Sequence, residues 1–264
     1  MAIDYEGKVR ALLSRAEHPE TPEAEAQACA AKAAELMMRH AIDEAALRAR
    51  RGERPEPISY WEHTVSGRDG HARARSSGLI AVVRAYGGEC ALRGDGTYRQ
   101  DITLLTVATR SAREALTLLL PSLTLQMDGA GVRAADSHIR HYPEELFRRK
   151  ADRTRWRNGY LKSFLVGYGD TVAERIAVAR GELREATWAA TGASCALVLA
   201  DDDARVRGEF DARFPSLGRA RGQRLRGDGF AAGRDAGRFA DIGSGTIDGS
   251  RRALGRARAR NGHR

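Results

Sequence analysis

The sequence predicts a mixed α+β fold that is predominantly helical, and three observations support this prediction. Long stretches carry apolar residues at helical spacing, above all near the N-terminus and over residues 143–188. Residues 89–93 and 98–108 have the composition of strands and flank Gly94-Asp95-Gly96, a typical hairpin turn. Glycine and proline separate most of these stretches. We therefore expect an N-terminal helical hairpin, a central small antiparallel sheet with packed helices, and a basic C-terminal helix and tail.

The N-terminal residues are predicted to form two packed helices. Residues 5–16 place their apolar side chains on one helical face. Thr21 and Pro22 suit a helix start, because threonine caps a helix and proline fits its first position. The second helix is expected to reach about His40, and its alanines permit close approach of a partner helix. Residues 43–51 add a short third helix.

The same N-terminal residues resemble a known family. The pattern consists of Lys8-Val9-Arg10-Ala11-Leu12-Leu13, Ala16, Thr21-Pro22, Glu25-Ala26, Ala30, Lys32-Ala33, Leu36-Met37 and Ile42-Asp43. It resembles the helical module DUF2786, a domain of unknown function, over about residues 6–47. The resemblance implies a helical module but no activity. Proteins with this module are common in bacteria and their phages and often continue into an α+β region, and this chain is similar in layout.

Composition divides the rest of the chain. The predicted segments are the DUF2786-like module at 1–50, a linker at 51–75, an α+β region at 76–215 and a basic Gly/Arg-rich C-terminal segment at 216–264. A short strand is expected at 58–65 within the linker. The last segment holds a short helix at 227–240, whose Gly233 and Gly237 permit close helix contact, and ends in a basic tail at 250–264.

Within the α+β region, helices are expected at 79–86, before Gly87-Gly88, and at 111–127, with Ser111 as the cap. Residues 143–188 form a long helical stretch that Gly167 and Gly169 interrupt. Residues 195–200 are expected to form a buried strand. Three aspartates at 201–203 then cap a helix that reaches about residue 210.

Several classes of protein are not favoured by the composition. The longest apolar run, residues 116–125, is interrupted by Pro121 and is shorter than the roughly 20 residues of a membrane span. The N-terminus lacks the basic and apolar pattern of a secretory signal. The three cysteines are far apart and odd in number, which is typical of a reducing compartment. We therefore expect a cytoplasmic protein without membrane contact.

The positive charge is concentrated near the C-terminus. Residues 205–264 carry 15 basic and 6 acidic residues, so their net charge of +9 equals that of the whole chain. Arginine supplies 40 of the 44 basic residues, as a high-GC genome would also produce. A codon bias does not by itself segregate charge, so the distribution favours binding to a polyanion.

Two basic segments are the candidates for nucleic-acid contact. In the first, basic residues lie beside Trp156 and Tyr160, which suits phosphate binding next to aromatic platforms. This segment comprises Arg148, Arg149, Lys150, Arg153, Arg155, Trp156 and Arg157. The tail supplies Arg251, Arg252, Arg256, Arg258 and Arg260, after an arginine-rich stretch at 219–226. The alternative interpretation is a solvated helix face and a tail shaped by codon usage.

Catalytic motifs are weak by comparison. No HExxH motif is present. His138 and His141, three residues apart, are weak candidates for metal ligands, but without a third ligand they are interpreted as surface histidines in a loop. Asp201 and Asp203 are weak candidates for Mg²⁺ ligands, but a helix cap explains them without a ligand. Glycine pairs such as Gly243 and Gly245 are interpreted as turns.

The leading functional hypothesis is a non-enzymatic, nucleic-acid-associated protein of a bacterium, plasmid or phage. It would bind backbone phosphates without clear sequence specificity and needs no cofactor. A metal-dependent nuclease or other hydrolase is the first alternative. A protein–protein adaptor, docking through the Ala-rich face of the N-terminal hairpin, is the second.

Overall fold

The computed structural model describes residues 5–17, 32–33, 36–37, 39–40, 54–94, 100–191, 194–218 and 222–240. These residues fall into two units, one with helix α1 (Tyr5–Glu17) and one within residues 37–240. In α1, Val9 is buried and Leu12 is half-buried, as expected of the apolar face predicted there. Of the second predicted helix, residues 32–33, 36–37 and 39–40 are described and are helical, with Ala33 and Met37 buried. The rest of the predicted hairpin and the tail at 250–264 lie outside the described residues.

The second unit contains a three-stranded antiparallel sheet. Its strands are β1 (Ile58–Val65), β2 (Glu89–Arg93) and β3 (Ile102–Thr109), in the order β1-β3-β2. The predicted pairing of β2 with β3 is confirmed, although β3 begins four residues later than expected. The strand predicted at 58–65 also forms and pairs with β3 along its whole length. Residues 58–65 of the predicted linker are thus part of the sheet.

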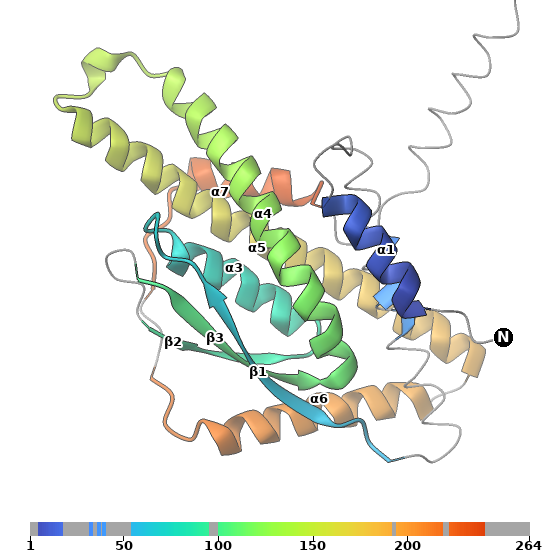
Figure 1. Ribbon diagram of the computed structural model, residues 1–264. Helices are drawn as coiled ribbons and strands as arrows, with labels where there is room; N and C mark the ends of the chain where they lie inside the picture. The colour runs from blue at the N-terminus through green and yellow to red at the C-terminus, as the bar shows by residue number, and fades with distance from the viewer. Residues whose placement is uncertain are drawn as a thin grey trace, which may run out of the picture. The chain divides into compact units, whose positions relative to one another are not determined.

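Helices cover both faces of this sheet (Figure 1). Alternate residues of β3, including the fully buried Ile102 and Leu104, face α3 (Ala72–Ala85) and α4 (Arg110–Arg140). The opposite face carries Val107, which packs with Phe210 of α6 (Ser194–Arg213). The predominantly helical α+β class is confirmed. None of the helices among the described residues has the length and apolar character that crossing a membrane requires.

Helix α6 corrects two predictions. Residues 195–200, expected to form a buried strand, are part of its first turns. A strand buried on both faces would hide each of its apolar residues, whereas Leu197 is 70% exposed and Leu199 is buried. No glycine or proline separates the apolar run from the three aspartates, so one helix continues through both. Asp201 to Asp203 are therefore inside the helix and do not cap it.

Helix α4 begins at a different cap from the one predicted. The Thr109 side chain accepts a hydrogen bond from the Ala112 N–H and is the N-cap. Ser111 is in the first turn, where its N–H and hydroxyl both donate to the carboxylate of Glu56, at 2.5 and 3.1 Å. This acid satisfies an otherwise unpaired N–H at the positive end of α4. The helix then continues to Arg140, well beyond the predicted end.

Glycines allow three helices to cross at close range. Helix α5 (Lys150–Thr191) runs through Gly167 and Gly169 without the predicted interruption. A Cβ on Gly169 would lie 2.2 Å from Cα of Gly78 in α3. A Cβ on Gly233, in α7 (Gly227–Gly237), would lie 2.1 Å from the carbonyl oxygen of Phe164 in α5. Close helix contact through the glycines of α7 was predicted and is confirmed.

Candidate nucleic-acid interface

The predicted basic segment lies where α4 and α5 meet. The connection between them contains one 3-10 turn, η1 (Glu144–Leu146). In Figure 1 these helix ends extend beyond the sheet, and we call residues 136–162 the α4–α5 tip. Arg148 and Arg149 precede α5, and Lys150 is its first residue. All three side chains are exposed, and none forms an ion pair within the part of the chain that the structure describes.

The other three arginines of the segment form ion pairs. Arg153 donates to Glu144 at 2.6 Å, which fixes η1 to α5. Arg157 donates to Asp136 at 2.5 Å, which joins α5 to α4. Arg155 lies 3.7 Å from Asp152, but its side chain is 82% exposed, so water screens this pair strongly. Arg157 therefore joins the two helices of the tip, and Arg153 is engaged with Glu144 at the surface, whereas Arg155 can contact an external anion.

Trp156 does not offer the aromatic platform that the sequence predicts. The guanidinium carbon of Arg226 lies 3.6 Å from the centre of its ring and covers one face. The rings of Tyr142 and Phe147 pack against it edge to face, with centroids at 5.8 and 6.3 Å. Its indole Nε1 is buried without a hydrogen-bond partner. The ring is thus part of the packing between α5, η1 and the start of α7.

Tyr160 is likewise inside the tip, with 6% of its surface exposed. The His138 ring stacks on it at 4.1 Å, and burial raises the pKa of the Tyr160 hydroxyl. His138 is in the last turn of α4, with Nε2 at 3.3 Å from the Asp228 carboxylate, so it is not in a surface loop. His141, at the C-cap, is exposed, and its Nδ1 lies 2.7 Å from the carbonyl oxygen of Ser137.

The weak metal-ligand candidates do not converge. Asp203 pairs with Arg180 of α5 at 3.2 Å, whereas Asp201 is exposed. Asp202, between them, is buried against Arg205 at 3.1 Å. Within the described ranges, no three histidine, cysteine or acidic side chains are grouped so that they could hold one ion.

The arginines of the second basic segment are only partly described. Arg251, Arg252, Arg256, Arg258 and Arg260 lie outside the described residues. Arg224 is exposed. Arg226 covers Trp156 and also hydrogen-bonds Asp228 at 3.3 and 3.4 Å. It therefore stabilises the tip, a role that no local pattern indicates because its aromatic partner is 70 residues away.

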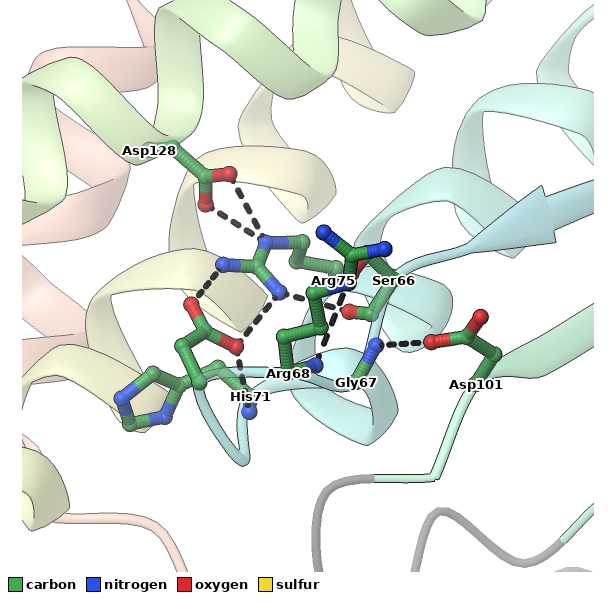
Figure 2. A network of polar contacts seen from close by, with 8 residues as sticks. Ser66, Gly67, Arg68, His71, Arg75, Asp101 and Asp128 are labelled. Atoms are coloured by element: carbon green, nitrogen blue, oxygen red, sulfur yellow. Dashed lines mark hydrogen bonds and ion pairs between the residues drawn. The ribbon is translucent and has the colours of Figure 1, made fainter.

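A second polar cluster was not predicted at all. Figure 2 shows Arg75 of α3 between Asp128 of α4 and the loop that follows β1. Its Nε donates to both oxygens of Asp128, at 2.7 and 2.9 Å. Its Nη1 donates to the carbonyl of Ser66 at 3.0 Å, and Asp69 accepts from both terminal nitrogens. All three nitrogens are engaged, so this buried arginine fixes the loop and does not present donors to a ligand.

The pKa values of the two acids in this cluster are shifted in opposite directions. Burial would raise the pKa of Asp69, but hydrogen bonds from Arg75 and from the His71 N–H outweigh it and lower that pKa. For Asp128, burial outweighs the hydrogen bonds from Arg75, and the pKa is raised. Asp69 therefore stays ionised to a lower pH than Asp128. The sequence around Arg73 and Arg75 did not indicate this cluster, because Asp69 and Asp128 lie in different parts of the chain.

Comparison with known proteins gives a family match for the N-terminal residues. Residues 7–44 match the family model described as "Protein of unknown function (DUF2786)". A search of curated proteins found no match, and neither did a search of solved structures. The DUF2786 resemblance of the N-terminal module is therefore confirmed, and the matched residues are separate in sequence from the α4–α5 tip.

Proposed function

We propose that this protein associates with nucleic acid, binds backbone phosphates without sequence specificity and catalyses no reaction. The observation that carries the proposal is the segregated charge, with a net +9 within residues 205–264. Such a concentration of arginine attracts polyanions through long-range electrostatics. The proposal includes a cytoplasmic location and an origin in a bacterium, plasmid or phage.

The α4–α5 tip supports the proposal from a separate region. Arg148, Arg149 and Lys150 are consecutive cations at the N-terminus of α5, without an acidic partner among the described residues. The positive end of a helix dipole disfavours cations there, and the three charges also repel one another. A bound phosphate would relieve both effects, because helix N-termini and basic side chains both stabilise anions.

The proposal is tested by electrophoretic mobility shift with the full chain over a range of salt. We expect binding at low salt that weakens steeply as salt increases, because each phosphate contact releases counterions. Deletion of residues 250–264 should flatten the salt dependence if the tail contacts phosphates. A failure to shift duplex or single strands even at low salt would rule the proposal out.

The alternatives have less support from the described residues. A metal-dependent hydrolase needs converging ligands, but Asp201, Asp203 and His138 lie in separate environments. A stoichiometric metal ion in the purified protein would nevertheless favour this alternative. The adaptor needs an accessible face on the N-terminal module, whereas Met37 is buried and Leu36 is half-buried.

A further inference from the structure

The unpaired charges of the α4–α5 tip are almost all positive. Residues 136–162 hold eight basic and four acidic residues. Three of the acids form the ion pairs described above, with Arg153, Arg155 and Arg157. The remaining charged residues are one acid, Glu145, and five cations. These cations form no ion pair among the described residues: Arg140, Arg148, Arg149, Lys150 and Lys162. The tip therefore presents a surface that suits a polyanion.

The aromatic rings of the tip pack against one another, so they are not available for stacking on a ligand. Tyr142 contacts both His138 and Trp156, and His138 stacks on Tyr160. Phe147 and Arg226 complete the enclosure of Trp156. Proteins that bind single strands usually combine a basic groove with rings on which bases stack. The tip has the basic residues but not the available rings.

Charge density then favours a duplex. Double-stranded DNA carries one negative charge per ~1.7 Å of axis, about twice the density of one strand in the same geometry. A surface that depends on charge alone gains more contacts from the denser array. A single strand would need stacking to compensate, and the covered rings of Trp156 and Tyr160 do not provide it.

The width of the tip favours contact with the backbones over entry into a groove. Helices α4 and α5 pack against each other, and Arg157 and Asp136 join them. Two such helices side by side are roughly 20 Å across, whereas the major groove of B-DNA is about 12 Å wide. The pair is too wide to lie lengthwise in the groove, so its cations would meet the phosphates at the groove edges.

We infer that the α4–α5 tip binds double-stranded nucleic acid across its phosphate backbones, in preference to single strands. The inference rests on the proposed function and adds the class of nucleic acid and the surface that contacts it. The cations in direct contact are Arg148, Arg149 and Lys150. Trp156 and Arg226 act by holding the tip in shape.

The test is fluorescence anisotropy of the full chain with a labelled duplex and with each of its strands, over a range of salt. The wild type should bind the duplex more tightly than either strand. The variant Arg148→Gln/Arg149→Gln/Lys150→Gln should lose duplex affinity by about tenfold or more at low salt. Its salt slope should fall by about 3, as expected for three lost phosphate contacts.

The matched control is Arg54→Gln/Arg110→Gln/Arg113→Gln, which removes the same charge from exposed arginines outside both the tip and residues 205–264. It should weaken duplex binding much less. Both variants keep residues 250–264, so the tail contributes equally. Circular dichroism and unfolding midpoints verify that both variants are folded.

The outcomes separate the inference from the proposed function. Equal or tighter binding of single strands would overturn the duplex preference and leave the proposed function standing. Full duplex affinity in the tip variant would overturn the tip as the contact surface. Absence of binding to every probe at low salt would overturn the proposed function, and the inference with it.

Discussion

Burial determines how much an arginine–carboxylate pair contributes to the stability of this protein. Arg75 and Arg93 both place their guanidinium nitrogens on carboxylates. The side chain of Arg75 is 8% exposed and that of Arg93 is 58% exposed. A buried pair that loses one partner leaves a charge without compensation, whereas water replaces the partner of an exposed one.

The substitution Arg75→Ala should therefore lower the free energy of unfolding by about 1.5–3 kcal/mol, because Asp128 and Asp69 lose a charged hydrogen-bond donor but remain partly accessible to water. Arg93→Ala, the matched control, should leave it unchanged within error. Urea unfolding at neutral pH measures both. Equal effects of the two substitutions would contradict the role given to Arg75.

His71 makes stability depend on pH in a defined window. It is 5% exposed, and its Nδ1 has no hydrogen-bond partner. Burial lowers its pKa from the ordinary 6.5, Asp69 opposes this effect, and Arg75, Lys162 and Arg157 add to it. Below about pH 6.5 the unfolded chain binds a proton that the folded protein takes up only at lower pH. The contribution of His71 to stability is therefore complete above that pH and is lost on acidification.

We expect the free energy of unfolding to fall as the pH is lowered below about 6.5, and His71→Leu should make this fall shallower. The fall should not vanish, because burial also lowers the pKa of His63. Urea unfolding at a series of pH values gives the two curves. Parallel curves for wild type and variant would show that His71 does not titrate as described.

At the scale of elements, glycine position decides how closely helices approach. Gly233 faces the backbone of α5, whereas a Cβ added to Gly208 of α6 would have nothing within 4 Å. Both are inside helices, where alanine is intrinsically preferred to glycine. The same substitution therefore has opposite expected effects at the two positions.

Gly233→Ala should destabilise the protein by about 1–3 kcal/mol or more, because α7 must move away from Phe164. Gly208→Ala should stabilise it by about 0.4–1 kcal/mol, through the lower entropy of the unfolded chain. Thermal unfolding followed by circular dichroism compares them. A tolerated Gly233→Ala would mean that α5 and α7 do not cross as closely as the structure places them.

At the scale of the whole molecule, α6 closes the face of the sheet that α3 and α4 leave uncovered. Phe210 and Val206 pack there with Val107 of β3 and Ala91 of β2. Arg205 also donates to the carbonyl of Glu56, just before β1. Residues more than 100 positions apart are thereby joined, and the sheet gains its second hydrophobic layer.

Phe210→Ala should cost about 3–5 kcal/mol of unfolding free energy, since it removes a large buried side chain from this layer. Phe239, which is 81% exposed, is the control, and its substitution by alanine should change stability by less than about 0.5 kcal/mol. Urea unfolding monitors both variants. A small effect at Phe210 would argue against α6 as the cover of this face.

The sequence by itself determined the features that depend on local chemistry. Composition and spacing were sufficient for the α+β class, for β1 and β2, for the end of α3 and for the N-terminal family module. The close helix contact through Gly233 was also predicted, because small residues four apart share a helix face. These features follow from neighbours within a few turns of the chain.

Tertiary structure alone decided which side chains remain available. Residues 195–200 suit a strand or a helix, and packing of α6 on the sheet selected the helix. The local sequence around Trp156 suits a stacking platform, but Arg226, from a distant segment, covers one face of its ring. By sequence, Arg153 and Arg157 suit phosphate binding, but in the structure they pair with Glu144 and Asp136. A charge or a ring is free or engaged according to its neighbours in space, and local sequence does not contain that information.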